Sequence, residues 1–469
     1  MRLQLRKPIL VGGMALSFGL WLFWSIRDTA LEIGEVSLLG TIAIGGSFWW
    51  LKHQFGQKTP PLIFPASLGR KEVEAAIAQT RDRLSILKAE DTDRDCSDLE
   101  VQLNLLPKRL ERQEVNIAIA GAKLAGKTCL QKILATSTWE NVTWQEMPTP
   151  SHSLENWQED CLQAADAVLW LLTGDLTDSE LQVLKRLRSV NQRILLLFNK
   201  GDRYIPEERE MILQQLHQHI LGILPAKDVF SILAAPAPIQ VRQHQGDGSL
   251  KEWQESQKPE TQPLRDRLEV ILSTERESLV WGTTWREAQT LQQQIKIRLN
   301  DIRRDRALPI VEQYQWIAAA TAFANPVAAL DLLATAAISA QMLVDLGAIY
   351  QQKLSLSVSK DTAGAIGQLM VKLGIVELST QAIGHLLKSN AITFVAGGTM
   401  QGISAAYLTR LAGLSLIAYF QDCAIDSTTE ETPFNWQKLT QKLKVVFEQN
   451  QRTEFLQGFA KQTMARFSS

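Results

Sequence analysis

Eight consecutive residues have the types and the spacing of a loop that binds phosphate. They read G-x-x-x-x-G-K-T and comprise Gly121, Ala122, Lys123, Leu124, Ala125, Gly126, Lys127 and Thr128. An apolar, β-branched run (115–120) precedes them, and a run with helical spacing (129–134) follows. A strand, a glycine loop and a helix N-terminus together present backbone N–H groups to a polyphosphate. In such a loop Lys127 reaches the β- and γ-phosphates, and the Thr128 hydroxyl binds Mg²⁺. The pattern predicts a Walker A nucleotide-binding loop.

A second motif concerns the choice of base. The apolar run 194–198 is typical of a buried strand, and it leads into Asn199, Lys200, Gly201 and Asp202. N-K-x-D after a strand, downstream of a Walker A loop, resembles the Era-like branch of the small GTPases. The resemblance implies that Asp202 accepts hydrogen bonds from guanine N1–H and its amino group, which adenine lacks. It also implies that Asn199 braces the loops and that the stem of Lys200 covers the base. GTP or GDP is the nucleotide implied.

The remaining segments fit the same α/β fold. Residues 164–172 form another apolar strand, and residues 175–180 open a helix with capping residues. Residues 230–235 resemble the last strand and base-contacting loop of the Era-like family. Residues 263–272 are expected to form the closing helix. We therefore expect an α/β P-loop GTPase-like domain over residues 112–275.

The expected switch motif is missing. GTPases of this type carry a threonine and then D-x-x-G, which hold Mg²⁺ and sense the γ-phosphate. No D-x-x-G lies between Thr128 and Ala167, and the segment 144–150 occupies its place. Thr136, Thr138 and Thr143 are candidates for the threonine. Nucleotide binding is therefore better supported than hydrolysis. The alternatives are a slow or partner-dependent GTPase and a non-hydrolysing pseudo-GTPase that acts as a membrane-bound interaction or regulatory module.

Composition excludes several other classes of protein. The formal net charge of −1 over 469 residues does not favour nucleic acid as a partner. The four cysteines are scattered without C-x-x-C or histidine pairing, which argues against a zinc site or a disulfide framework. Cys129, beside the phosphate loop, is expected to be a small buried residue rather than a redox switch.

The N-terminal segment predicts a membrane anchor. Residues 8–26 and 36–51 carry no charge and include tryptophans suited to a membrane interface. Basic residues precede and follow the pair, so the positive-inside rule places both ends in the cytoplasm. We expect a transmembrane hairpin over residues 1–57, which makes the protein multi-pass in the bilayer with its nucleotide and C-terminal domains facing the cytoplasm. A signal peptide is the competing interpretation, and a second apolar segment argues against it.

Helical segments flank the nucleotide domain. Residues 58–111 are expected to be a linker and spacer helices, one over 71–88 and one over 99–110, packed on the nucleotide domain. After that domain, a stripe with coiled-coil spacing comprises Ala288, Leu291, Ile295, Leu299 and Ile302. An intramolecular helix pair and a homodimer or protein partner through this helical region are both compatible with the stripe.

The C-terminal region is rich in alanine and glycine and is expected to be an all-α domain over residues 276–425, with a helical tail over 426–469. Its N-P…L-D and G-G…Q-G…Y-L-T-R patterns (325–331 and 397–410) resemble the domain of unknown function typified by the inner-membrane protein YcjF. Small residues at helical spacing let helices approach closely in water or in lipid. We expect a compact helical domain at the membrane surface, with insertion of parts of 316–420 as the alternative. A dynamin-like membrane remodeller is a third functional class that the long helices suggest.

Overall fold

The computed structural model describes residues 68–91, 95–136, 139–148, 159–244, 250–324, 328–352, 354, 356–379, 381, 383, 398–423 and 434–450. The predicted hairpin over 1–57 lies outside these residues, as do Thr138 and most of the predicted tail.

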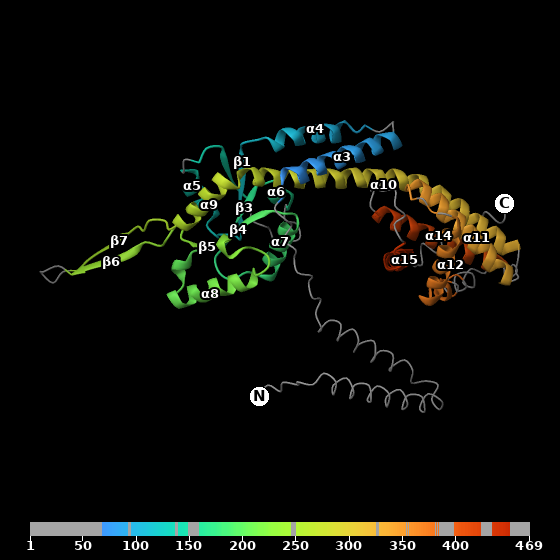
Figure 1. Cartoon of the computed structure of the whole chain (residues 1–469). Coiled ribbons are helices and arrows are strands. Elements are labelled where there is room, and N and C mark those ends of the chain that lie inside the picture. Colours follow the sequence, from blue (N-terminus) through green and yellow to red (C-terminus); the bar gives the residue numbers. More distant parts are fainter. Residues whose placement is uncertain are drawn as a thin grey trace, which may run out of the picture. The chain divides into compact units, whose positions relative to one another are not determined.

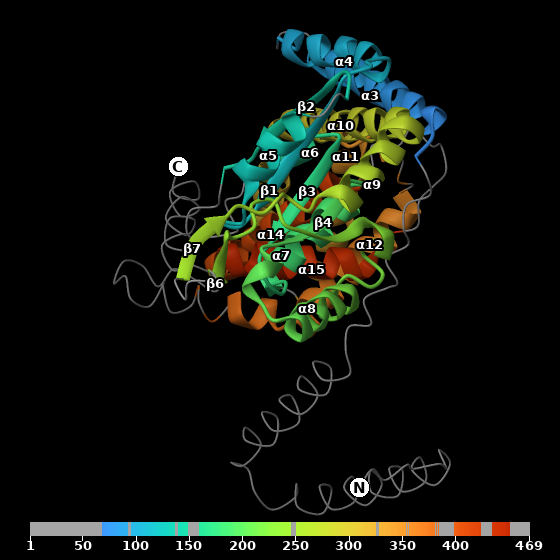
Figure 2. The same cartoon turned by 90° about the vertical axis from the view of Figure 1, so that its left-hand side faces the viewer.

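The nucleotide domain is built on a five-stranded parallel sheet (Figures 1 and 2). The strands are β1 (Val115–Gly121), β2 (Val142–Glu146), β3 (Ala167–Leu172), β4 (Arg193–Asn199) and β5 (Val229–Ile232), in the order β2-β1-β3-β4-β5. β1, β3 and β4 are almost wholly buried, which explains their continuous apolar runs. The predicted α/β architecture is confirmed, and the structure adds that the sheet is parallel and includes β2, which was not foreseen.

Helices cover this sheet and complete its core. They are α5 (Lys127–Ala135), α6 (Glu159–Gln163), α7 (Asp178–Ser189), α8 (Pro206–His219) and α9 (Gln262–Thr274), with short 3₁₀ turns at Gly201–Arg203 and Ala226–Asp228. α5 and α9 bury Leu130, Leu134, Leu264 and Leu268 against sheet residues such as Ile119 and Leu169. A capping box begins α7, because Thr177 accepts from the Glu180 N–H and the Glu180 carboxylate accepts from the Thr177 N–H. The closing helix predicted over 263–272 is therefore α9, and the helix predicted to begin with capping residues at 175–180 is α7.

A β-hairpin interrupts the chain between β5 and α9. Its strands are β6 (Ile239–His244) and β7 (Leu250–Glu255), which pair antiparallel and form a two-stranded sheet of their own. Figure 1 shows it outside the five-stranded sheet. Nothing in the sequence analysis anticipated this hairpin.

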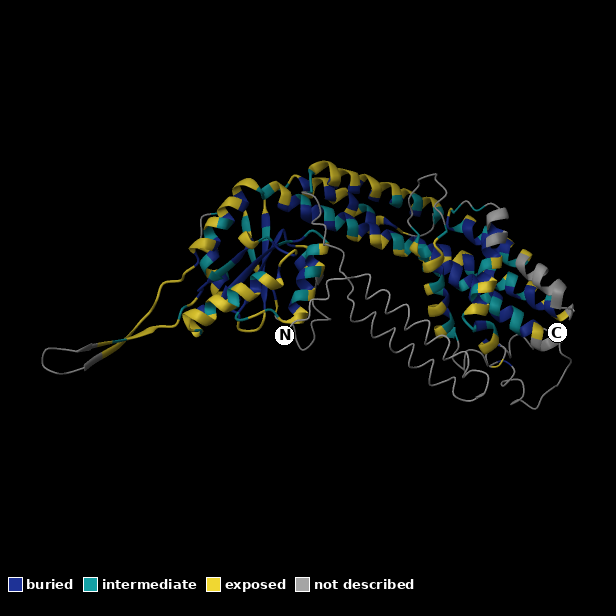
Figure 3. Ribbon diagram, turned by 60° about the horizontal axis from the view of Figure 1, so that its bottom comes forward, coloured by how far each residue is buried: buried dark blue, intermediate teal, exposed yellow. Residues whose placement is uncertain are grey.

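One long helix leaves the nucleotide domain and runs into the C-terminal domain. It is α10 (Arg276–Ala324), 49 residues long, with Pro309 inside it. The predicted coiled-coil stripe on α10 packs against α3 (Arg70–Glu90) and α4 (Ser97–Leu110). Figure 3 shows buried residues alternating with exposed ones along the long helices. The stripe is therefore covered within the chain. The buried residues of α3 and α4 pack on α10, whereas we expected these helices to pack on the nucleotide domain.

A buried polar cluster attaches α10 to the nucleotide domain. Asp166, the residue before β3, accepts hydrogen bonds from the Asn116 N–H at 2.7 Å, from Thr283 Oγ1 at 2.6 Å and from Arg112. Arg286 on α10 donates to the carbonyls of Gln163, Ala165 and Asn191. Burial lowers the pKa of Arg286 to about 10, which still leaves the guanidinium charged at neutral pH. Because these charges and carbonyls satisfy one another, removing either side chain would leave the other groups buried without their partners.

The C-terminal part is helical, as predicted. Its helices are α11 (Ala328–Ile349), α12 (Leu356–Lys372), α14 (Gly398–Asp422) and α15 (Trp436–Asn450), and they share one core with the end of α10. α15, which we had assigned to a separate tail, contributes Leu439, Leu443 and Val446 to that core. Among the described residues, one helix, Gln401–Asp422, is long and apolar enough to cross a membrane, and 67% of its window is buried inside the protein. A core helix of a soluble bundle shows the same burial, so this helix does not by itself place the domain in a membrane.

Candidate functional site

The Walker A residues lie in a loop at the carboxyl end of β1 and lead into α5. Gly121 and Gly126 both adopt positive φ, 139° and 99°. A Cβ at Gly121 would collide with the carbonyl oxygen of Leu171, and one at Gly126 with the side-chain amide of Asn199. Both glycines are therefore required by close approach as well as by backbone conformation. The loop lies next to the point where the chain order of the sheet reverses, between β1 and β3, which is where α/β sheets bind ligands.

The tip of the loop is open to solvent. Ala122, Lys123 and Leu124 are exposed, whereas Ala125 is buried. Leu124 combines a positive φ of 62° with 77% exposure, which is an unfavourable conformation for a leucine and an unfavourable place for its side chain. Such strain in a loop concentrates at ligand sites. The loop therefore leaves its backbone accessible to a ligand.

Lys127 is held inside the loop. Its Nζ donates to the carbonyl oxygens of Gly121 and Ala122, at 3.0 Å each, and only 5% of the residue is exposed. Burial lowers the pKa of Lys127, and the nearby Glu146 carboxylate partly opposes this shift. The ammonium thus lies at the base of the loop at the N-terminus of α5, where an anion would be stabilised by both the charge and the helix dipole.

Glu146 is a site residue that the sequence analysis missed. It ends β2, and the Thr128 hydroxyl donates to its Oε1 at 3.1 Å. β2 runs parallel to β1 with Glu146 paired to Ile119, so its carboxyl end arrives beside the Walker A loop. A search for D-x-x-G passed over this residue because it is a glutamate without a following glycine. The available signal was its position at the end of a strand beside β1.

Asn199 joins three loops. Its Nδ2 donates to the carbonyl of Ala125 at 2.8 Å, and its Oδ1 accepts from the N–H of Ala234 at 3.0 Å. The residue is 1% exposed, so both backbone groups depend on this one amide for their hydrogen bonds. The Walker A loop, the end of β4 and the loop after β5 are therefore fixed to one another.

Lys200 and Asp202 continue from Asn199 on the solvent side. Lys200 has a positive φ of 65°, and Asp202 lies in the 3₁₀ turn that follows it. Asp202 is exposed, and its Oδ2 accepts from the N–H of Ala237 at 3.0 Å. The hydrogen bond from the loop after β5 thus orients the exposed carboxylate of Asp202.

The two candidate switch threonines that the structure describes, Thr136 and Thr143, bond groups outside the Walker A loop. Thr136 bonds the carbonyl of Ile133 at the end of α5, and Thr143 on β2 bonds Asn116. Thr138 and the segment 149–158, which follows β2, lie outside the described residues. The hydroxyls of Thr136 and Thr143 are therefore both used in hydrogen bonds, at the end of α5 and between neighbouring strands.

The cysteines differ from expectation in one respect. Cys129 is exposed, not buried, because α5 turns Leu130 and Leu134 toward the core and leaves Cys129 on its outer face. Cys96 is buried, and the described part of the chain contains no cluster of three or more metal-binding His, Cys, Asp or Glu side chains.

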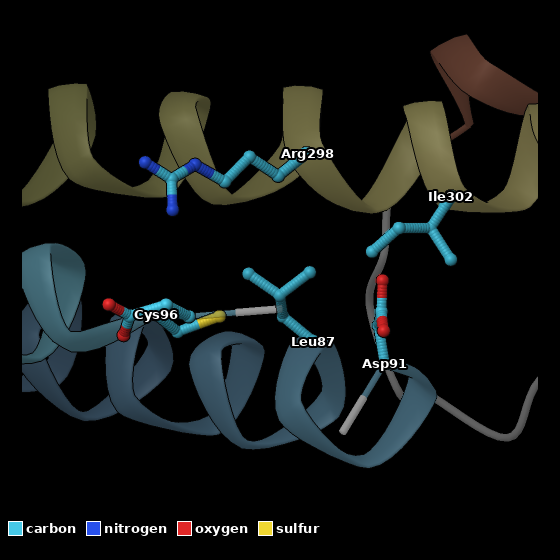
Figure 4. Close-up of a pocket in the computed structure, with 6 residues that line it drawn as sticks. Leu87, Asp91, Cys96, Arg298 and Ile302 are labelled. Carbon is cyan, nitrogen blue, oxygen red and sulfur yellow. The ribbon is translucent and has the colours of Figure 1, made fainter. Parts of the chain in front are cut away.

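A separate cavity of about 230 Å³ lies between α3, α4 and α10, away from the Walker A loop (Figure 4). Leu87, Cys96 and Ile302 form its apolar walls, and Asp91, Asp95 and Arg298 lie around it. Arg298 pairs with Asp98, which lies on α4.

Comparison with known proteins identifies the C-terminal part. A family model for a domain of unknown function, DUF697, matches residues 286–452. The match overlaps the region 276–425 in which a YcjF-type domain was expected, and it extends to include α15, consistent with the shared core. No curated protein matches the chain.

Similar solved structures include two bacterial dynamin chains. "LeoA bacterial dynamin GTPase from ETEC" is 12% identical, covers 84% of this chain and 98% of its own, with a TM-score of 0.24. A chain from "An oligomerised bacterial dynamin pair provides a mechanism for the long-range sensing and tethering of membranes" is 11% identical and covers 84% and 78%, also with a TM-score of 0.24.

Proposed function

We propose that the protein is a membrane-anchored guanine-nucleotide-binding protein with an Era-like nucleotide domain over residues 112–275. The observation that carries this proposal is the pair of hydrogen bonds made by Asn199. They bring the Walker A loop, N-K-x-D and the loop after β5 to one edge of the sheet. One nucleotide can contact a phosphate-binding loop and a base-contacting loop at the same time only when the two loops lie this close together.

Base selection rests on Asp202. Its carboxylate offers two acceptor oxygens, which match the N1–H and amino donors of guanine, and the Ala237 N–H orients it. Adenine has an acceptor at N1 and would leave the carboxylate unsatisfied. Isothermal titration of the full chain with GTP, GDP and ATP tests the assignment. We expect binding of both guanine nucleotides, and equal affinity for ATP would refute it.

The residues at the loop suit Mg²⁺. Thr128 and Glu146 place a hydroxyl and a carboxylate within 3.1 Å of each other, and hard oxygen ligands are what this ion prefers. Mg²⁺ usually takes one or two protein oxygens and completes its shell with phosphate and water, so a larger cluster of carboxylates is not required. Thr128 would bind the ion, and Glu146 would hold it or its water. When bound, Mg²⁺ neutralises charge on the phosphates.

Turnover separates the two functional alternatives. Glu146, the carboxylate beside the Walker A loop, already accepts a hydrogen bond from Thr128, and no D-x-x-G lies between Thr128 and Ala167. We therefore propose tight binding with slow or partner-dependent hydrolysis, and a non-hydrolysing regulatory module remains the alternative. A phosphate-release assay on purified protein with Mg²⁺ distinguishes them.

The membrane part of the proposal rests on the sequence of residues 1–57. The hairpin would hold the nucleotide domain and the helical domain at the cytoplasmic face. The region that the DUF697 model matches, residues 286–452, would then lie at the membrane surface. Flotation of the full chain with lipid vesicles, compared with a variant lacking residues 1–57, tests the anchor. Loss of flotation only in the truncated variant is the expected result.

A further inference from the structure

The Walker A loop carries a second cation at its tip. Lys123 is exposed beside Leu124, and within the described part of the chain its side chain has no hydrogen bond or ion pair. An exposed ammonium without a partner is available to an anionic ligand. We infer, on the basis of the proposed nucleotide-binding function, that Lys123 contacts the γ-phosphate of the bound nucleotide. This contact would make the site prefer GTP over GDP.

Covalent geometry keeps Lys123 close to the ammonium of Lys127. Lys127 Nζ donates to the Ala122 carbonyl oxygen at 3.0 Å, and that carbonyl belongs to the same peptide unit as the Lys123 N–H. With standard bond lengths, the backbone nitrogen of Lys123 therefore lies within about 5 Å of Lys127 Nζ. Because a lysine ammonium is carried on a flexible four-carbon stem, Lys123 can reach a phosphate group that Lys127 contacts.

The two lysines have different surroundings. Lys127 is buried and its Nζ also donates to the Gly121 carbonyl, which holds it at the base of the loop. Lys123 lies at the exposed tip, next to Leu124 with its positive φ of 62°. Binding of Lys123 to a ligand would break no contact within the described chain, so its main cost is the loss of side-chain rotamer freedom. Lys127 is thus in place before a nucleotide binds, whereas Lys123 can move to the added negative charge of a third phosphate.

The two residues that follow Glu146 at the end of β2 offer no free backbone donor. The Met147 N–H donates to the Ile119 carbonyl at 2.9 Å, and Pro148 has no N–H. No D-x-x-G, the motif that senses the γ-phosphate in Era-like GTPases, stands in this part of the sequence. Lys123 would therefore supply, from the Walker A loop, a positive charge for the group that D-x-x-G would contact.

The affinity for a GTP analogue relative to that for GDP tests this contact in the full chain, in detergent. A non-hydrolysable β,γ-imido analogue keeps the third phosphate throughout the titration. Lys123→Gln should lower the ratio of the two affinities about 5- to 30-fold and leave GDP affinity unchanged, because it removes a charged partner at a partly solvated site. Lys123→Arg keeps the charge and should keep the ratio. Added salt should lower the ratio more in the wild type than in Lys123→Gln, since screening acts on the charge that the variant lacks.

Lys132→Gln is the matched control, because Lys132 is an exposed lysine in the last turn of α5, at the far end of the helix from the loop. It changes the net charge equally and should leave the ratio at the wild-type level. An unchanged ratio in Lys123→Gln, or an equal loss of affinity for both nucleotides, would overturn the γ-phosphate contact and leave the proposed nucleotide site standing. A wild-type protein that binds neither guanine nucleotide would overturn the proposed function and this contact with it.

Discussion

The Thr128 hydroxyl donates to Glu146 Oε1 across 3.1 Å, which links the first turn of α5 to the end of β2. The contact joins the residue proposed to bind Mg²⁺ to the nearest carboxylate on the neighbouring strand. A glutamate, not the aspartate of D-x-x-G, thus places a carboxylate at this edge of the sheet.

Glu146→Gln should therefore make nucleotide binding demand more Mg²⁺. The amide keeps the hydrogen bond to Thr128 but loses the negative charge, and loss of such a supporting group typically costs 10- to 100-fold in metal affinity. Titration of GTP binding against Mg²⁺ concentration measures the shift. Gln145→Glu, which adds a carboxylate on the exposed side of β2, is the matched control. An unchanged Mg²⁺ midpoint in Glu146→Gln would show that this carboxylate does not serve the ion.

Asp202→Asn should weaken GTP binding and favour xanthine nucleotide. The substitution replaces one acceptor oxygen by a donor, so guanine loses a charged hydrogen-bond partner worth about 1.5–3 kcal/mol. Competition between GTP and XTP reports the change. The contact with the Ala237 N–H survives in the variant, so its melting temperature should stay close to wild type.

Lys127→Ala should abolish nucleotide binding, because it removes the only cation that the Walker A motif places on the β- and γ-phosphates. The wild-type protein should bind GTP with Mg²⁺ and hydrolyse it very slowly without a partner. Phosphate release and equilibrium binding are measured on the same preparations. Rapid hydrolysis by the wild type that disappears in Lys127→Ala would show that a further residue orients the attacking water.

The membrane hairpin predicts a definite topology. Labels near Asp28 should react from the outer side of the membrane, whereas labels at Met1 and Ser469 should react only after the membrane is opened. Membrane-impermeant thiol reagents on single-cysteine variants provide the measurement. Labelling of Ser469 from outside would mean an odd number of crossings or a wrong hairpin.

Alkaline pH should destabilise the helical domain through Tyr350. Burial raises the pKa of this phenol, which stacks on Phe420, to about 12, whereas in the unfolded chain it titrates near 10. Above pH 10 the unfolded state loses the proton first, so stability is constant below pH 10 and falls between pH 10 and 12. The two-unit difference corresponds to about 2–3 kcal/mol. Denaturant midpoints at pH 9 and 11 should differ less in Tyr350→Phe than in wild type.

The sequence was sufficient for the elements with strong patterns. The buried runs of β1, β3 and β4 and the motifs at their ends were readable because each strand is covered on both faces. β2 was missed because it is a short edge strand, half exposed, in which polar residues alternate with Val142 and Trp144. Glu146 was missed with it, since its role follows from the pairing of β2 with β1. The β6–β7 hairpin escaped notice because its strands are as polar as loops.

The number of residues in α10 fixes the rotation about the helix axis between the contacts at its start and those near its end. The helix meets the nucleotide domain through Arg286, α3 and α4 along its middle, and α14 near its end, where Gly413 lies against Val311. Each residue of an α-helix turns the chain by about 100° and advances it by about 1.5 Å. A single deletion between Arg286 and Val311 would therefore rotate one set of contacts out of register with the other. Removal of seven residues, close to two full turns, would leave both sets of contacts on the same sides of the helix and shorten α10 by about 10 Å. Changes in the length of α10 should thus be tolerated, if at all, in steps of whole turns.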